Sequence, residues 1–325
     1  MGLRPDVVQA HIAHWEQQLN SGNRPYRRHW PARLFRHEPI ENAAKILKDG
    51  VLHSRTDAAE AIVRDIAPID IIRSRHEAHR SVRLYFRPKT PTQYHIEGIR
   101  KASEYYQGRH APVLAIFIFE AMDILIRDGV EFSDGNMQSP ETNKGSTEEE
   151  FGSIPFNHVY HEGSFDPVSS LGAEIIRRRC AEVLLPSPLY LVGTLQAVMC
   201  RSTAERTTLL HLLGDAAAQW NPQIRVFSQP GLFENIYAYL DTVDARSEGI
   251  SFRFHPRRDG RDVITEMWVY DESSELLVHV GPMPLATGNA YAVEHTFTPG
   301  RYLTRFEVDG CLAYESPFFI DEQPF

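Results

Sequence analysis

The sequence of 325 residues has little of what marks several large classes of protein. Its three cysteines, Cys180, Cys200 and Cys311, are too few and too scattered for a disulfide framework or a zinc cage. It has no run of about 18 apolar residues, the length that a membrane-spanning helix needs. The first fifteen residues carry His, Gln and Glu where a secretory signal has its apolar stretch, so we expect a cytoplasmic protein that does not contact a membrane.

Short motifs for common chemistries are also missing. Neither a G-x-G-x-x-G fingerprint nor a Walker A sequence occurs, which argues against the Rossmann and P-loop classes. Histidines recur as His-x-x-His pairs, but without the H-E-x-x-H arrangement or a nearby pair of thiolates, so we expect no metal site. These pairs are His11/His14, His76/His79 and His158/His161.

The net charge of −9 argues against a protein that coats nucleic acid by bulk attraction. Basic residues nevertheless gather in two short segments, 24–36 and 73–89, while acidic residues concentrate at 141–150 and in the C-terminal third. Local basic grooves on an acidic body suit a polyanion held in one place, such as a dinucleotide or a short nucleic-acid strand. A solvated charged face is the alternative explanation.

Apolar periodicity predicts alternating helices and strands in the first two thirds of the chain. We expect helices over 6–19, 39–49 and 91–106, the second closed by Gly50. The segment 82–86 is typical of a strand. Further strands are expected over 112–120, 181–185 and 224–227, a helix over 203–220, and a long loop over 133–167, a length that is usually functional or disordered.

The pattern changes near residue 236 to short alternating segments separated by turns such as Asp309-Gly310. This pattern is typical of a small β-sandwich of about 90 residues. We therefore divide the chain into an N-terminal helix and linker (1–30), a mixed α/β domain (31–235) and a β-sandwich accessory domain (236–325).

The most informative stretch is 177–185, three arginines followed by Cys-Ala-Glu-Val-Leu-Leu. A carboxylate in so apolar a strand costs several kcal/mol unless it has a partner. Glu182 is therefore the first candidate for a catalytic residue. The alternative is an edge strand in which Glu182 faces water or pairs with Arg178.

A second stretch, 84–94, is a strand that ends in two aromatics and leads into a turn fixed by prolines. It places Arg87 and Lys89 beside the start of a helix, where phosphate binds well. Turn geometry accounts for the prolines but leaves the two cations unexplained.

Four segments in order resemble the DarT family, bacterial toxins that transfer ADP-ribose from NAD to bases of nucleic acid. They are 35–50, 84–94, 132–136 and 179–184, and the resemblance covers roughly residues 33–235. It implies an α+β fold with an ADP-ribosyltransferase-like split β-sheet core and flanking helices. The C-terminal β-sandwich lies outside it, and we expect that domain to serve target choice, partner docking or assembly.

The resemblance implies roles for individual residues. Glu182 matches the catalytic glutamate, which would stabilise the cation-like ribose as nicotinamide leaves. Arg73 and Arg75 compete for the place of an arginine before the Tyr-Phe strand, and Arg73 is favoured as the catalytic one. Arg73 or Arg75, with Asn42 and His37, would hold the diphosphate and nicotinamide of NAD.

The NAD site is completed by residues of two further segments. Asn42 matches the family's asparagine, whereas the family's histidine falls on Arg36, with His37 one residue away. Tyr85 and Phe86 belong to the same site, although a role in the core explains them equally well. Residues expected to bind the acceptor are Arg87, Lys89, Tyr94, Asn136, Phe156, His158 and Tyr160.

The main hypothesis is an ADP-ribosyltransferase toxin that consumes NAD, needs no metal and modifies a base in single-stranded DNA or RNA. The resemblance also implies an antitoxin partner protein and a setting such as phage defence. Two alternatives stay open: the same fold acting on protein or water as acceptor, and a catalytically silent module that binds nucleic acid or a partner.

Overall fold

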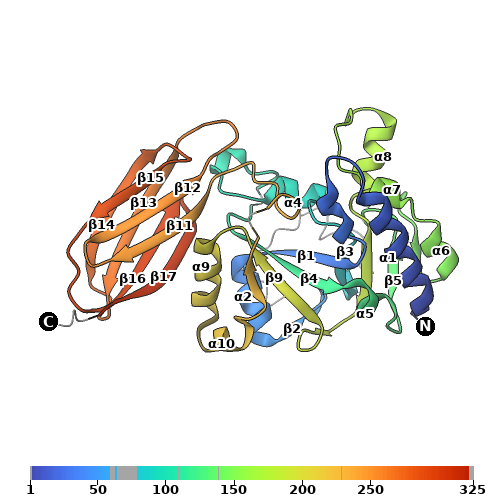
Figure 1. Ribbon diagram of the computed structural model, residues 1–325, viewed down its shortest axis with the longest axis horizontal. Coiled ribbons are helices and arrows are strands. Elements are labelled where there is room, and N and C mark those ends of the chain that lie inside the picture. The colour runs from blue at the N-terminus through green and yellow to red at the C-terminus, as the bar shows by residue number, and fades with distance from the viewer. Residues whose placement is uncertain are drawn as a thin grey trace.

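The computed structural model describes residues 2–58, 63, 79–108, 110–137, 139–227 and 229–321. Within these residues, helices and strands form two regions that lie at opposite ends of the long axis (Figure 1). The first, residues 33–226, is mixed α/β and is called the catalytic region because it contains the candidate residue Glu182. The second is an all-antiparallel β region. The helical elements are α1 (Pro5–Leu19), η1 (Pro25–His29), α2 (Ile40–Asp49), α4 (Pro91–Ile96), η3 (Ala102–Glu104), α5 (Ala121–Leu125), α6 (Glu148–Gly152), α7 (Phe156–Val159), α8 (Ser170–Arg178), α9 (Thr203–Leu213), η4 (Gly214–Ala216) and α10 (Ala217–Trp220).

The catalytic region is built on an eight-stranded sheet with the order β10-β9-β4-β1-β3-β7-β5-β6 among the described residues. A separate two-stranded sheet pairs β2 with β8. The strands are β1 (Arg33–Pro39), β2 (Val51–Leu52), β3 (Ser81–Tyr85), β4 (Leu114–Glu120), β5 (Glu131–Ser133), β6 (Lys144–Gly145), β7 (Glu182–Pro186), β8 (Leu189–Tyr190), β9 (Leu195–Cys200) and β10 (Ile224–Val226).

The large sheet is nearly divided in two between β1 and β3. Seven residue pairs join β1 to β4 and five join β3 to β7, but only Phe35 and Tyr85 pair across the junction between β1 and β3. The expected α+β fold with a split sheet is confirmed. The strand predicted over 112–120 is β4, whose residues from Leu114 to Phe119 are all buried.

Three expected elements differ from the structure. The helix predicted over 203–220 ends at Leu213 as α9 and is followed by η4 and α10. The helix predicted over 91–106 is wrong beyond Ile96, where Glu97 turns to extended backbone. Gly98 follows with a φ of +92°, and a Cβ there would lie 2.8 Å from the Cβ of Tyr237, so only glycine fits this left-handed position. The long loop predicted over 133–167 contains β6, α6 and α7.

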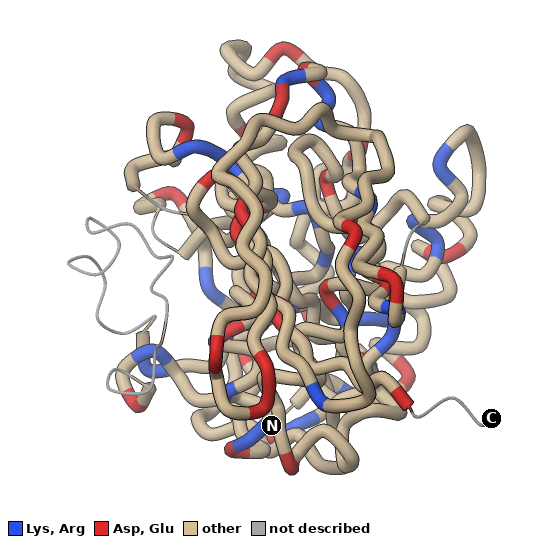
Figure 2. The backbone as a smooth tube through the Cα atoms, turned by 90° about the vertical axis from the view of Figure 1, so that its left-hand side faces the viewer, with Lys and Arg blue, Asp and Glu red and all other residues tan. Residues whose placement is uncertain are grey.

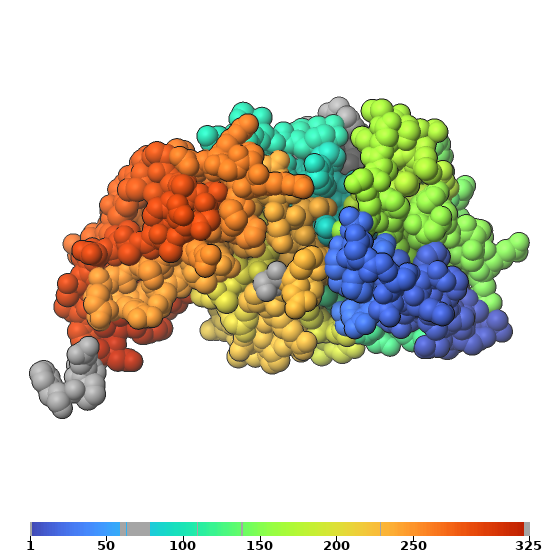
Figure 3. All heavy atoms as spheres, turned by 45° about the horizontal axis from the view of Figure 1, so that its top comes forward, coloured from blue at the N-terminus to red at the C-terminus, as the bar shows by residue number. Residues whose placement is uncertain are grey.

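The N-terminal helix α1 lies at the end of the molecule away from the β region (Figures 1 and 3). Val8 and Ile12 on its inner face join the catalytic core, and the backbone N–H of Leu3 donates to the carbonyl of Leu125. The predicted amphipathic helix is therefore confirmed, and it packs on the catalytic region.

The C-terminal region is the expected β-sandwich. One sheet has the order β11-β12-β15 and the other β14-β13-β16-β17, and their inner faces share one hydrophobic cluster. Its strands are β11 (Tyr239–Arg246), β12 (Gly249–His255), β13 (Val263–Asp271), β14 (Leu276–Leu285), β15 (Ala290–Glu294), β16 (Gly300–Val308) and β17 (Cys311–Ile320).

The hydrophobic core of the sandwich extends into the catalytic region. Ile99 and Ala204 are buried in the same cluster as Phe254 and Phe306 of the sandwich. Helix α9 packs against both β11 and β17, and its N-cap Ser202 donates from its hydroxyl to the carbonyl of Leu240 at 2.6 Å. The chain passes from one sheet to another near residue 236, but the hydrophobic core continues across this point. The domain boundary expected there stays a prediction.

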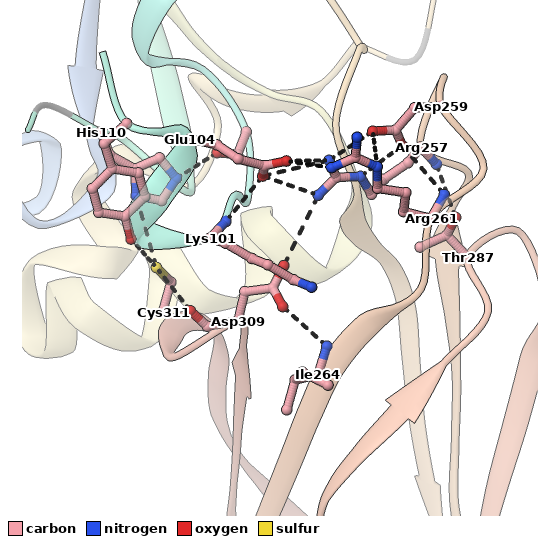
Figure 4. A network of polar contacts seen from close by, with 12 residues as sticks. Lys101, Glu104, His110, Arg257, Asp259, Arg261, Ile264, Thr287, Asp309 and Cys311 are labelled. Atoms are coloured by element: carbon pink, nitrogen blue, oxygen red, sulfur yellow. Dashed lines mark hydrogen bonds and ion pairs between the residues drawn. The ribbon is translucent and has the colours of Figure 1, made fainter. Parts of the chain in front are cut away.

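Ion pairs also join the sandwich to the catalytic region, at a second place beside the shared core (Figure 4). Arg257 of the sandwich, only 2% exposed, donates to Glu104 of η3 at 3.1 Å and to Asp259 at 2.9 Å. Asp309 lies 4.0 Å from the same guanidinium. A charge as buried as that of Arg257 is stable only when it is paired. These ion pairs therefore fix the sandwich against the segment that follows α4.

Charge is divided unequally between the two regions. Residues 236–325 hold 15 acidic and 7 basic side chains, whereas the rest of the chain holds 28 and 27. Figure 2, which looks onto the sandwich, shows acidic segments both along the strands and in the turns. No helix within the described residues is both long and apolar enough to cross a membrane.

We predict that the catalytic region and the sandwich unfold together. Replacing Ile99 by Ala removes apolar contacts that both regions share, and should cost about 2–5 kcal/mol. Calorimetry should show one transition in the parent protein, with its midpoint lowered as a whole in the variant. The control is Ile264→Ala, because Ile264 is 38% exposed and its loss should change little. Two transitions, of which only one moves, would contradict the prediction.

Candidate active site

Glu182 begins β7, an interior strand between β3 and β5. Its residue is 1% exposed, so the alternative of an edge strand with a solvated carboxylate is wrong. The preceding Ala181 and following Val183 are fully buried, which explains why the sequence forms a strand here. The backbone N–H of Glu182 donates to the hydroxyl of Ser133 on β5 at 3.2 Å, which anchors the start of the strand.

The partner of Glu182 is Arg83 and not Arg178. The guanidinium of Arg83 donates from Nε to one carboxylate oxygen at 3.1 Å and from Nη2 to the other at 2.5 Å. Arg178 instead pairs with Asp134. Burial lowers the pKa of Arg83, but the adjacent carboxylate outweighs it and holds that pKa above its usual value.

His37 and Tyr85 form a stacked pair beside the carboxylate. Tyr85 lies opposite Glu182 in the β3–β7 register, and its ring stacks on His37 with centroids 5.3 Å apart and an interplanar angle of 4°. Burial, followed by the charge of Arg36, lowers the pKa of His37 to about 3. The imidazole is therefore neutral at physiological pH and offers one donor and one acceptor.

Arg36 and Asn42 belong to a second polar group that adjoins the first. Arg36 donates to Glu38 at 2.6 Å and from Nη1 to the carbonyl of Arg83 at 3.0 Å. Asn42, near the start of α2, donates to Glu38 at 3.4 Å and accepts from the backbone N–H of Val63. The structure thus brings Glu182, Tyr85, His37, Arg36 and Asn42 into one connected set.

The two cations of the proline turn are engaged within the protein. Arg87 is fully buried and donates to the carbonyls of Pro88, Val159 and His161, with its guanidinium 4.8 Å from the ring centre of Trp30. Burial lowers its pKa well below the usual value.

Lys89 pairs with Glu162 and lies 3.9 Å from Glu234. Glu162 also accepts from the hydroxyl of Tyr26 at 3.0 Å. Any acceptor phosphate at Lys89 would therefore compete with two carboxylates, so the binding roles expected for Arg87 and Lys89 stay predictions.

Two aromatic residues expected at the acceptor site, Phe156 and Tyr160, lie in an apolar cluster with Phe86, which was expected at the NAD site. Phe86 meets Phe156 edge to face at 5.2 Å, and Tyr160 stacks on Phe156 at 5.5 Å. His11 of α1 lies 3.1 Å from the hydroxyl of Tyr160. Helix α1 thereby holds the segment that carries α7, and the binding roles expected for these three aromatic residues stay predictions.

Three further residues expected to bind the acceptor lie outside the connected set around Glu182. Tyr94 is 51% exposed and meets His95 edge to face. Asn136 accepts from the hydroxyl of Thr142 through its carbonyl, within a turn. His158 lies 3.8 Å from Glu174.

Arg73 and Arg75 lie outside the described residues, so their roles in catalysis and NAD binding stay predictions. A search of the residues that are described finds no group of three His, Cys, Asp or Glu side chains close enough together to hold a metal ion.

The sequence reasoning missed Arg83. A strand over 82–86 places Arg83 and Tyr85 on one face, because side chains alternate along a strand. Pairing that strand antiparallel to 181–185 brings this face to Glu182. The signal was present, but the register between the two strands was needed to read it.

Comparisons with known proteins agree with this geometry. A family model described as ssDNA thymidine ADP-ribosyltransferase, DarT, matches residues 35–233. Among solved structures, Thermus sp. 2.9 DarT in complex with ADP-ribosylated ssDNA matches with a TM-score of 0.50 and 19% identity, covering 61% of this chain and 95% of that one. No curated protein gives a significant match.

Two other similar structures match the same share of the chain. Thermus sp. 2.9 DarT in complex with NAD+ has a TM-score of 0.48 and 18% identity, over 61% of this chain and 96% of that one. Thermosipho africanus DarTG in complex with ADP-ribose has a TM-score of 0.44 and 17% identity, over 61% and 50%.

The split sheet and the buried glutamate on β7 define an NAD-dependent ADP-ribosyltransferase. Within that class, the chain belongs to the DarT family, whose model spans more than half of its length. The sandwich and helix α1 lie outside the matched residues.

We predict that His37 contributes to a loss of stability in acid. Its pKa is about 3 in the folded protein and ordinarily about 6.5, so the unfolded chain binds the extra proton between these values. The free energy of unfolding should fall as the pH falls from about 6.5 to about 3, and less steeply in His37→Gln. Urea unfolding at several pH values measures this, with the more exposed His279→Gln as control. Equal slopes in the parent protein and His37→Gln would disprove it.

Proposed function

We propose that this protein transfers ADP-ribose from NAD to the base of thymidine in single-stranded DNA. The observation that carries the proposal is Glu182, a buried carboxylate on the interior strand β7 within the segment matched by the family model. A buried carboxylate stabilises a developing positive charge better than a water-exposed one, because electrostatic stabilisation is strongest where water is excluded.

NAD supplies an activated ribose from which nicotinamide departs, leaving a sugar carbon with cationic character. Glu182 stabilises that charge, and Arg83 and the start of β7 hold its side chain in place. The carboxylate also accepts hydrogen bonds from ribose hydroxyls or takes the proton of the attacking base nitrogen.

The neighbouring groups suit the donor. His37 is neutral, so it binds by hydrogen bonding and stacking without repelling the positively charged nicotinamide ring. Asn42 and Arg36 supply an amide and a fixed cation beside it. Arg73 or Arg75 would hold the diphosphate, in keeping with the family resemblance. The donor is consumed in the reaction, and no step requires a metal.

The acceptor is a single strand because the reacting edge of a paired base is occupied. We place it on the catalytic region, since the accessory domain carries 15 acidic against 7 basic side chains and repels a polyanion. The exposed ring of Tyr94 offers a stacking face at one side of the proline turn.

The biological setting rests on family resemblance alone. We infer a toxin that a partner protein neutralises, in a system such as phage defence, acting in the cytoplasm. RNA as acceptor is the alternative that the experiment below separates from DNA.

The decisive prediction concerns labelling of oligonucleotides. With labelled NAD, the protein should modify single-stranded DNA that contains thymidine and leave DNA without thymidine, duplex DNA and RNA unmodified. Glu182→Gln should lower the rate about 10²-fold or more, because the charge is lost while the shape is kept. Mass analysis of the products identifies the modified base.

The control must separate catalysis from folding. Glu182→Gln leaves the charge of Arg83 without its partner, so the double variant with Arg83→Met, which removes both charges, is tested alongside by thermal unfolding. A folded but inactive variant supports the proposal. Absence of label on every polymer with the parent protein, or equal label on RNA, would refute it.

A further inference from the structure

Arg83 is the one side chain, within the described part of the structure, that hydrogen-bonds to the carboxylate of Glu182. It binds both oxygens, through Nε at 3.1 Å and Nη2 at 2.5 Å. In the β3–β7 ladder Tyr85 pairs with Glu182 and Arg83 with Leu184, so Arg83 reaches the carboxylate along the diagonal on the same face of the sheet.

We propose that Arg83 is a positioning residue of the reaction, which holds Glu182 in one orientation before NAD arrives. The proposal rests on the role of Glu182 given above, and it adds a residue that acts through the catalytic carboxylate. A two-pronged guanidinium contact fixes both the rotation and the location of a carboxylate, which a single contact does not.

The surroundings show why a fixed cation is needed here. Among the described residues, the other titratable groups facing the carboxylate are Tyr85 on β3 and Cys180 just before β7. Burial raises the pKa of both, that of Cys180 to about 12, so both are neutral at pH 7. The adjoining strand β5 contributes the uncharged hydroxyl of Ser133. A buried carboxylate is stable only when it is paired, and in this part of the structure Arg83 is the cation that pairs with it.

Arg83 is itself held in place. Its backbone carbonyl accepts from Nη1 of Arg36 at 3.0 Å, which joins β1 to β3 near the point where the sheet divides. Its side chain is 19% exposed against 1% for Glu182, so the cation lies at the edge of the dry region and the carboxylate within it. The arginine therefore orients Glu182 from the more exposed side of the pair.

The test compares the rate of nicotinamide release by Arg83→Met, Arg83→Lys and the parent protein. Arg83→Met should lower kcat about 10²-fold with little change in KM for NAD, because the carboxylate is no longer held in its productive orientation. Arg83→Lys keeps the charge but loses the fork, so kcat should drop about tenfold.

The matched control is Arg305→Met, since Arg305 binds Glu307 and Glu315 in the accessory domain and its loss should alter neither kcat nor KM.

The outcomes are distinct. An unchanged kcat in Arg83→Met would overturn the positioning role, as would parent-like kcat in Arg83→Lys should the methionine variant fail to fold. A parent protein that releases nicotinamide but leaves DNA unlabelled, with that release slowed in Arg83→Met, would refute the proposed acceptor and support the role of Arg83.

Discussion

The single residue pair between Phe35 and Tyr85 is the constraint on which the site depends. It keeps β1 and β3 in one sheet while leaving the rest of their length unpaired, and it defines the register of β1 against β3. Paired residues share a face, so His37 on β1, Arg83 and Tyr85 on β3, and Glu182 on β7 all project to the same side. A slip of one residue in β3 would turn Arg83 and Tyr85 away from the glutamate.

Much of this arrangement is visible in the sequence, and the part that is hidden has a physical reason. The apolar run around Glu182 predicts a buried strand, and Gly50 predicts the end of α2, because both are local effects. The partner of Glu182 depends on which strands pair and in what register, which local patterns do not specify. The nearest arginine along the chain, Arg178, is satisfied by Asp134 instead.

The turn after β3 shows a second limit. The sequence places Arg87 and Lys89 at a helix start and leaves their partners unknown. In the structure Arg87 donates hydrogen bonds to the carbonyls of Val159 and His161, and Lys89 lies between Glu162 and Glu234. Those partners come from segments far away in sequence. The two cations therefore look like phosphate ligands in the sequence but are bound by other parts of the protein in the structure. The end of α4 was also missed, since the contact between Gly98 and Tyr237 is equally distant.

The common core of the catalytic region and the sandwich has a consequence for the order of events during synthesis. Ile99 and Ala204 emerge from the ribosome well before β16 and β17, which complete the cluster that covers them. The apolar side chains of Ile99 and Ala204 therefore stay uncovered until β16 and β17 have been made.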